Sequence, residues 1–159
     1  MDYEGTPRKN SQKVNVYIIL GVLILAILLF LAFRLLFNRE SITVSEAINI
    51  SHEAYVNGDM DSYIRSIDEQ VAKLKTNQEK ANLYSTRAGD LYNYRLSNNS
   101  DKYNSEILNS AYKAESIYPT ARTAYQIYLY ESEIGSKETA EQYYKLSKDR
   151  GIDKEQGAG

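Results

Sequence analysis

The stretch LYSTRAGDLYNYRL (residues 83–96) places its apolar side chains at steps of three and four residues. The side chains that follow this spacing are Leu83, Tyr84, Ala88, Leu91, Tyr92 and Leu96. Such spacing puts them on one face of an α-helix, and the alternation expected of a strand is absent. The stretch therefore predicts an amphipathic helix with one buried face.

The same spacing continues on both sides of this stretch. Further apolar faces are Ala47-Ile50-Ala54-Tyr55, Tyr63-Ile64-Ile67-Val71-Leu74 and Ile107-Leu108-Ala111-Tyr112-Ala114. Asn, Gly, Ser and Pro cluster at residues 57–59, 75–77, 97–100, 118–119 and 133–135, and these residues stop helices or cap the next one. We therefore predict six helices of roughly ten to seventeen residues and an all-α domain over 41–149.

A second kind of segment precedes this domain. Residues 16–33, VYIILGVLILAILLFLAF, contain no charge, and at about 1.5 Å per residue a helix of this length approaches the ~30 Å hydrocarbon core of a bilayer. A cleaved signal peptide would need a shorter apolar core and a small-x-small cleavage site, which residues 33–37 do not offer. A buried core helix would carry polar positions on one face. We predict a single transmembrane helix over 16–37.

The flanks of this helix suggest an orientation. Three basic residues, Arg8, Lys9 and Lys13, precede it, and two follow it. This bias favours a single-pass protein with a cytoplasmic N-terminus and an extracytoplasmic C-terminal domain. We expect the polar tails 1–15 and 150–159 to be disordered.

Charge and residue usage exclude several function classes. Residues 40–159 carry 14 Lys and Arg against 19 Asp and Glu, a net charge of −5. An acidic domain is repelled by phosphate backbones, so we expect no nucleic-acid partner. The chain has no cysteine, which excludes disulfides and thiolate metal sites.

The sequence offers no constellation typical of catalysis. His52 is the only histidine, so one chain cannot form a histidine-based metal site. Asp59 and Asp61 hint at a calcium loop, but the glycine and glutamate required at its sixth and twelfth positions are missing. We interpret these two residues as turn and helix N-cap residues. The sequence predicts no enzyme activity, catalytic residue, metal, cofactor or small-molecule substrate.

The helices pair, and we expect the pairs to recur every 35 to 40 residues or so. The stretch GSKETAEQYYKLS (135–147) resembles the second half of a tetratricopeptide repeat, in which a turn glycine is followed by a small residue, an aromatic and another small residue. Residues 58–67 resemble the same half, with Tyr63 where Ala is usual. In the middle pair, Ala88-Gly89 before Tyr92 and the ending at residues 114–119 are similar to other family positions.

This resemblance covers residues 44–149 and implies an α-solenoid of about three hairpins. Its small residues would let paired helices approach closely: Ala88, Gly89, Ala114, Ala140 and Ser147. In the family, the first helix of each pair lines a concave partner-binding surface. Carried over to this sequence, the candidate groove residues are Ile48, His52, Tyr55, Thr86, Asp90, Asn93, Arg122, Tyr125 and Leu129.

The resemblance implies a protein-binding function. We expect a scaffold or adaptor, anchored in the lipid bilayer through residues 16–37, that binds a protein partner at the membrane surface. Assembly, secretion or chaperone work in a bacterial cell envelope would suit such a protein. The alternative is a structural subunit of a cell-envelope or secretion complex, which would associate with copies of itself.

Overall fold

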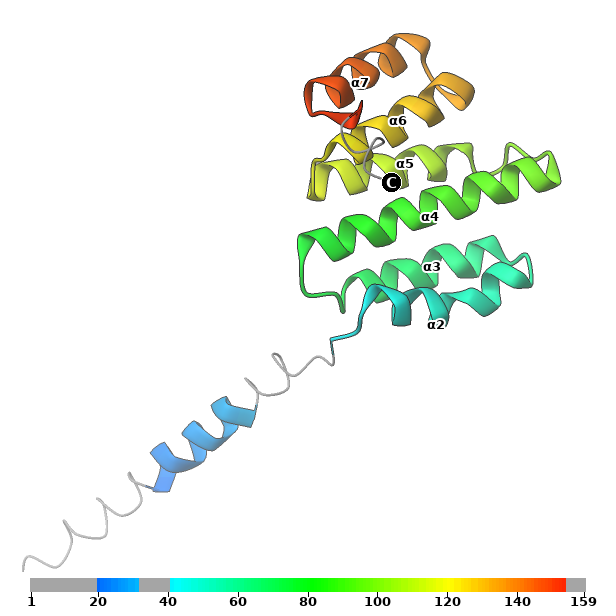
Figure 1. Cartoon of the computed structure of the whole chain (residues 1–159). Coiled ribbons are helices and arrows are strands. Elements are labelled where there is room, and N and C mark those ends of the chain that lie inside the picture. Colours follow the sequence, from blue (N-terminus) through cyan, green and yellow to red (C-terminus); the bar gives the residue numbers. More distant parts are fainter. Residues whose placement is uncertain (1–19, 32–40, 154–159) are drawn as a thin grey trace, which may run out of the picture. The chain divides into compact units, whose positions relative to one another are not determined.

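The computed structural model describes residues 20–31 and 41–153. The chain divides into two compact units between residues 40 and 41. In the first unit, residues 20–31 form a helix, drawn in blue in Figure 1. Its side chains are exposed on all sides, and most of them are large and apolar.

The predicted transmembrane helix is contradicted. The described helix over 20–31 has twelve residues and rises about 18 Å, against a hydrocarbon core of ~30 Å. Within residues 20–31 and 41–153, no helix combines the length and the apolar character that crossing a bilayer requires. This finding overturns the predicted span over 16–37 and the single-pass localisation and orientation built on it. Residues 16–19 and 32–37 of that span, and the tail 1–15, lie outside the described residues.

The second unit confirms the predicted all-helical character of the domain. Residues 41–153 contain α2 (Val44–Val56), α3 (Met60–Val71), α4 (Asn77–Asn98), α5 (Asn104–Ile117), α6 (Ala121–Ile134) and α7 (Lys137–Asp149). Each predicted break lies at a junction between two of these helices. The length of α4 differs from expectation, because it runs for 22 residues.

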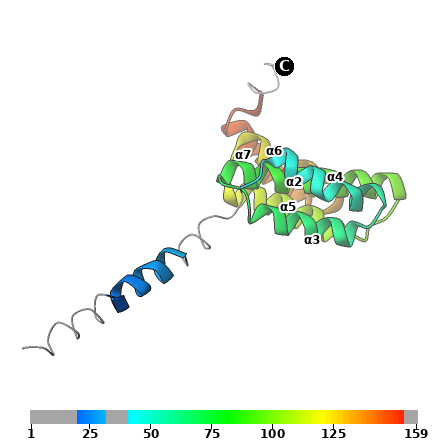
Figure 2. The same ribbon diagram turned by 90° about the horizontal axis from the view of Figure 1, so that it is seen from below.

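The helices form three hairpins, α2–α3, α4–α5 and α6–α7, which stack in sequence order (Figure 1). Helices pack most closely within each pair, and α3 against α4 and α5 against α6 join neighbouring pairs. Viewed along the stack, α2 and α4 lie on one side and α3 and α5 on the other (Figure 2). The domain therefore has a helical-repeat-like architecture with α4 at its centre.

Each first helix of a pair begins with a threonine cap. Thr43, Thr76 and Thr120 each accept a hydrogen bond from the backbone N–H three residues later, and that residue's side chain accepts one from the threonine N–H. These reciprocal bonds satisfy two backbone donors that the first turn leaves unpaired. The Asp59 side chain accepts from Ser62 N at 3.0 Å, which confirms its interpretation as the N-cap of α3.

The hairpins do not recur at the expected interval of 35 to 40 residues. The first helices α2, α4 and α6 begin at residues 44, 77 and 121, which are 33 and then 44 residues apart. The second interval is longer because α4 has 22 residues against 13 in α2 and 14 in α6. The extra length therefore lies mainly in a helix rather than in the turn over 99–103.

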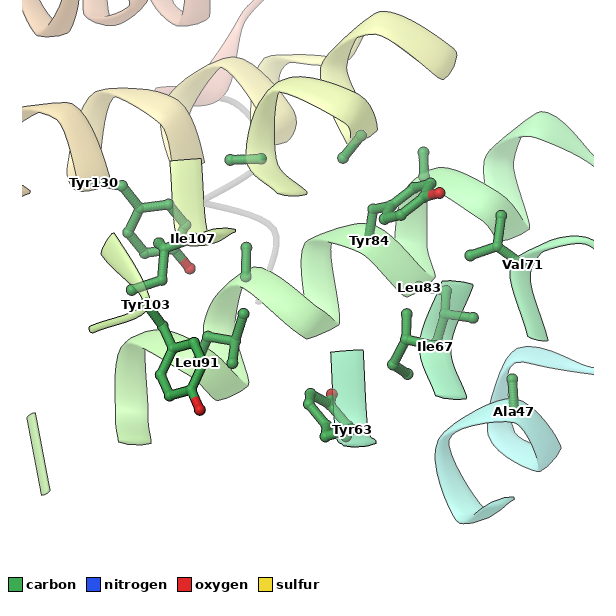
Figure 3. Close-up of a cluster of buried hydrophobic side chains, with 14 of the residues drawn as sticks. Ala47, Tyr63, Ile67, Val71, Leu83, Tyr84, Leu91, Tyr103, Ile107 and Tyr130 are labelled. Atoms are coloured by element: carbon green, nitrogen blue, oxygen red, sulfur yellow. The ribbon is translucent and has the colours of Figure 1, made fainter. Parts of the chain in front are cut away.

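One cluster of buried side chains runs from Ala47 on α2 to Tyr130 on α6 (Figure 3). Leu83, Leu91 and Ile107 in this cluster are completely buried. The core crosses the boundaries between hairpins, so each hairpin depends on its neighbour to bury its apolar face. Four of the small residues expected at close helix contacts are buried here or at the third hairpin: Ala88, Ala114, Ala140 and Ser147.

Packing continues beyond the end of α7. Ile152 is buried, and Arg150 Nη1 lies 2.6 Å from Glu115 Oε1 on α5. Residues 150–153 are thus fixed against the domain, whereas we expected a disordered tail from residue 150. The remainder of that tail, residues 154–159, lies outside the described residues.

A charged side chain is buried where the first and second hairpins meet. Arg87 on α4 has no exposed surface. Its Nη1 donates to Asp68 Oδ1 on α3 at 2.8 Å, its Nε donates to Ser110 Oγ on α5 at 2.8 Å, and its Nη2 has no partner among the described residues. The guanidinium therefore joins three helices and depends on Asp68 for its charge balance.

We predict that Asp68→Ala lowers the free energy of unfolding by about 2 kcal/mol, because it leaves the buried Arg87 without a counter-charge. The cost stays below that of a fully buried pair since the Asp68 side chain is 45% exposed. Urea unfolding followed by circular dichroism measures it. The double variant Asp68→Ala/Arg87→Met should lose less free energy of unfolding than Asp68→Ala alone. A larger loss in the double variant would contradict this explanation.

Two glycines form a matched pair of stability tests. At Gly89, inside α4, a Cβ would meet only the Tyr130 hydroxyl, at 3.8 Å, so Gly89→Ala should stabilise by about 0.5–1 kcal/mol. At Gly135 a Cβ would lie 1.9 Å from Glu131 Oε2, and Ser136 N holds that oxygen at 2.6 Å. Gly135→Ala should therefore destabilise by about 1–3 kcal/mol. Thermal unfolding of both variants checks the opposite signs, and equal signs would refute the packing described for them.

Candidate functional site

An open groove of about 670 Å³ lies between α4 and α6, the first helices of the second and third hairpins. Helix α4 contributes Gln78, Ala81, Asn82, Ser85 and Thr86. The turn before α6 and α6 itself contribute Tyr118, Arg122, Tyr125, Gln126, Leu129 and Tyr130. Apolar, aromatic and uncharged polar side chains thus share the lining, with Arg122 as its charged member.

Side chains from both helices fix the geometry of this groove. Gln126 Nε2 donates to the Ser85 carbonyl oxygen at 3.0 Å and to the Tyr130 hydroxyl at 3.1 Å. The Tyr130 ring lies against Tyr92 of α4, with ring centroids 5.1 Å apart. These contacts hold α4 and α6 in register, so the groove is formed before any partner arrives.

The groove also presents apolar surface to solvent. Leu129 is 43% exposed and Tyr118 is 41% exposed, while Tyr125 is half-buried. The Tyr125 ring lies 5.4 Å from that of Tyr128 on the same helix, which limits its freedom. A partner that covered Leu129 and Tyr118 would remove apolar area from water and gain free energy from it.

A second group of side chains lies one turn further along α4. Asp90 is half-buried and accepts a hydrogen bond from the Tyr63 hydroxyl. Burial raises the pKa of the Asp90 carboxyl, although the Tyr63 hydrogen bond and the charge of His52 act in the opposite direction. The Tyr55 ring lies 5.5 Å from that of Tyr63. Burial, and after it the charge of Asp90, raise the pKa of Tyr55.

Of the nine candidate groove residues, four line the groove, three belong to the group at Asp90 and two belong to neither. Lining the groove between α4 and α6 are Thr86, Arg122, Tyr125 and Leu129. Asp90, Tyr55 and His52 belong to the second group: the Tyr55 ring lies beside that of Tyr63, which binds Asp90, and the charge of His52 acts on the Asp90 carboxyl. Ile48 is half-buried against the core, and Asn93 is exposed and belongs to neither group.

Sequence reasoning missed several residues of the site. The α4 candidates began at Thr86, whereas the groove extends back to Gln78. Asn82 lies four residues before Thr86 and therefore on the same face of the helix, so helical spacing could have identified it. Tyr63 was expected only in the core, and no sequence signal indicated that its hydroxyl reaches Asp90.

The residues described in 20–31 and 41–153 contain no group of three or more His, Cys, Asp or Glu side chains placed to hold a metal ion. Comparisons with protein-family models, with curated proteins and with solved structures found no match. The resemblance to tetratricopeptide repeats therefore stays a prediction.

We predict that Asp90→Asn stabilises the domain near pH 7. The pKa of Asp90 is raised in the folded state, so the unfolded chain carries the negative charge more readily and stability falls as pH rises through the folded pKa. Asparagine removes the charge and can still accept the Tyr63 hydrogen bond. Urea midpoints should therefore be higher for the variant near pH 7 and should converge below the ordinary pKa of 3.8. A variant less stable than the wild type near pH 7 would contradict the dominance of burial.

Proposed function

We propose that residues 41–153 form a tetratricopeptide-like module that acts as a scaffold or adaptor by binding an extended segment of a protein partner. The observation that carries this proposal is the preformed groove between α4 and α6, with exposed Leu129 and Tyr118 on its surface. Stacked helical repeats commonly bind partners on an extended concave surface.

The groove has the dimensions and chemistry for a short stretch of chain. Its lining runs from Gln78 to Thr86 on α4 and from Arg122 to Tyr130 on α6, which corresponds to about 12 Å of helix. An extended peptide covers that length with about four residues. The backbone of such a peptide needs donors and acceptors, which the amide side chains of Gln78 and Asn82 can supply, while the apolar part of the lining can take a side chain.

The alternative function, a subunit that associates with itself, finds less support in the described domain. Ile50 and Val56 on α2 are 54% and 65% exposed. They are six residues apart, which places them on different sides of the helix, so they do not form a patch. Single exposed apolar residues are ordinary on a protein surface. The groove is therefore the better candidate for a binding surface.

An array of random-sequence peptides tests the proposal. The full chain is used, in a non-ionic detergent that covers the exposed apolar helix over 20–31. We predict that wild-type protein binds a subset of the peptides and that Leu129→Ala weakens this binding about tenfold, because a partly exposed anchor in the groove is lost. Fluorescence anisotropy of the best peptides measures the change.

Leu96→Ala is the matched control, since Leu96 is an exposed leucine of α4 that does not line the groove. It should leave peptide binding unchanged, and both variants should keep the thermal unfolding of the wild type. Absence of peptide binding, or an equal loss in both variants, would overturn the proposal. Sedimentation velocity adds one check: an oligomer dissolved by Leu129→Ala would favour the self-associating subunit instead.

A further inference from the structure

Asp90 is a half-buried carboxylate without a cationic partner in the described part of the chain. None of the ion pairs there includes it. Its Oδ2 accepts from the Tyr63 hydroxyl, whereas its Oδ1 accepts no hydrogen bond from a described residue and is not sealed from solvent. One carboxylate oxygen is therefore open to an incoming donor.

The two buried glutamates of the domain are satisfied differently. Glu115 binds Arg150 through Oε1 at 2.6 Å and Thr123 through Oε2 at 2.5 Å. Glu131 accepts from the Tyr112 hydroxyl at 2.5 Å and from Ser136 N at 2.6 Å. Both have a partner on each oxygen, as burial of a carboxylate requires. Both carboxylate oxygens of Glu115 and of Glu131 thus have hydrogen-bond partners, whereas only one oxygen of Asp90 has one among the described residues.

Tyrosine side chains from three helices lie in the neighbourhood of this carboxylate: Tyr63 donates its hydroxyl to it, and the Tyr55 ring lies 5.5 Å from that of Tyr63. Tyr55 comes from α2, Tyr63 from α3 and Tyr130 from α6. Tyr130 also lines the groove, and its hydroxyl would lie 3.8 Å from a Cβ placed at Gly89, next to Asp90. Asp90 does not itself line the groove, but it lies one helical turn after Thr86, which does, and so on the same face of α4.

This combination suits a cation with an apolar stem. A carboxylate forms charge-assisted hydrogen bonds with an ammonium or guanidinium group, and tyrosine rings attract a cation over their faces. The methylene chain of a lysine or arginine can lie along such rings. His52 does not fill this position, because it forms no ion pair with Asp90 within 4.0 Å, as the described ion pairs show.

We infer that the protein segment bound in the groove carries a lysine or arginine side chain that Asp90 recognises. This inference rests on the proposed function and adds the chemistry of the partner to it. The net charge of −5 over residues 40–159 favours the approach of a basic segment.

The test uses peptides synthesised in pairs on the same array, each random sequence once with a central lysine and once with norleucine at that place. Norleucine keeps the four-carbon chain and removes the charge. Wild-type full chain should bind the lysine member of a bound pair about tenfold more tightly. Asp90→Asn should abolish this preference and leave binding of the norleucine member unchanged.

Asp149→Asn is the matched control, because it removes the same charge from an exposed position at the end of α7. It should keep the lysine preference. Raising the salt concentration should shrink the preference of the wild type, since salt screens an ion pair at a solvent-accessible site.

The outcomes separate this inference from the proposed function. If peptide binding depends on Leu129 but shows no lysine preference, or if the preference survives Asp90→Asn or is indifferent to salt, the inference fails and the groove proposal stands. If no peptide binding depends on Leu129, both fail. A lysine preference lost in Asp90→Asn and kept in Asp149→Asn supports both.

Discussion

The burial of α4 between its neighbours is the constraint on which the rest of the domain depends. This helix packs against α2, α3 and α5, and its side chains Leu83, Ala88 and Leu91 are buried. With these sides occupied, a remaining part of the α4 surface faces α6, and the groove lies there. The position of the candidate site is thus a consequence of how the hairpins stack.

Two partly or fully buried charged residues of this stack differ in how many hydrogen-bond partners they have. At the α3–α4–α5 contact, Arg87 is completely buried and two of its nitrogens have partners, so the charge serves the packing. One helical turn beyond the groove residue Thr86, Asp90 retains an open oxygen and a pKa raised by burial. The half-buried charge of Asp90 lowers the stability of the fold and does not contribute to packing. Such residues are often found at binding sites, because function uses groups that folding alone would not favour.

Sequence reasoning found the helices because apolar periodicity and turn residues are local signals. It located every junction from residue 57 to residue 136, and it interpreted Asp59 correctly as a cap. It did not predict that Arg87 is buried, because a charged residue in a helix is normally expected to face solvent. The apolar run over 16–33 has the composition of a membrane helix, but no helix within the described residues has the length and apolar character to cross a bilayer.

The candidate site was only partly predictable for a related reason. Periodicity identifies the apolar face of a helix, but it does not tell which polar residues lie beside the next hairpin. In α6 the three candidates Arg122, Tyr125 and Leu129 all line the groove, whereas in α4 only Thr86 does. The α4 candidates were aligned on Ala88 and Gly89, and this placed them too far toward the C-terminal end of a helix longer than its counterparts.

The most direct measurement of the central claim is an NMR titration of ring-labelled tyrosines in the full chain with its tightest-binding peptide. The chain has 15 tyrosines, and among the described ones some line the groove and others do not. The account predicts that the signals of Tyr118, Tyr125 and Tyr130 shift on binding, while those of Tyr103 and Tyr143, which do not line the groove, stay in place. Shifts confined to Tyr103 and Tyr143 would contradict it.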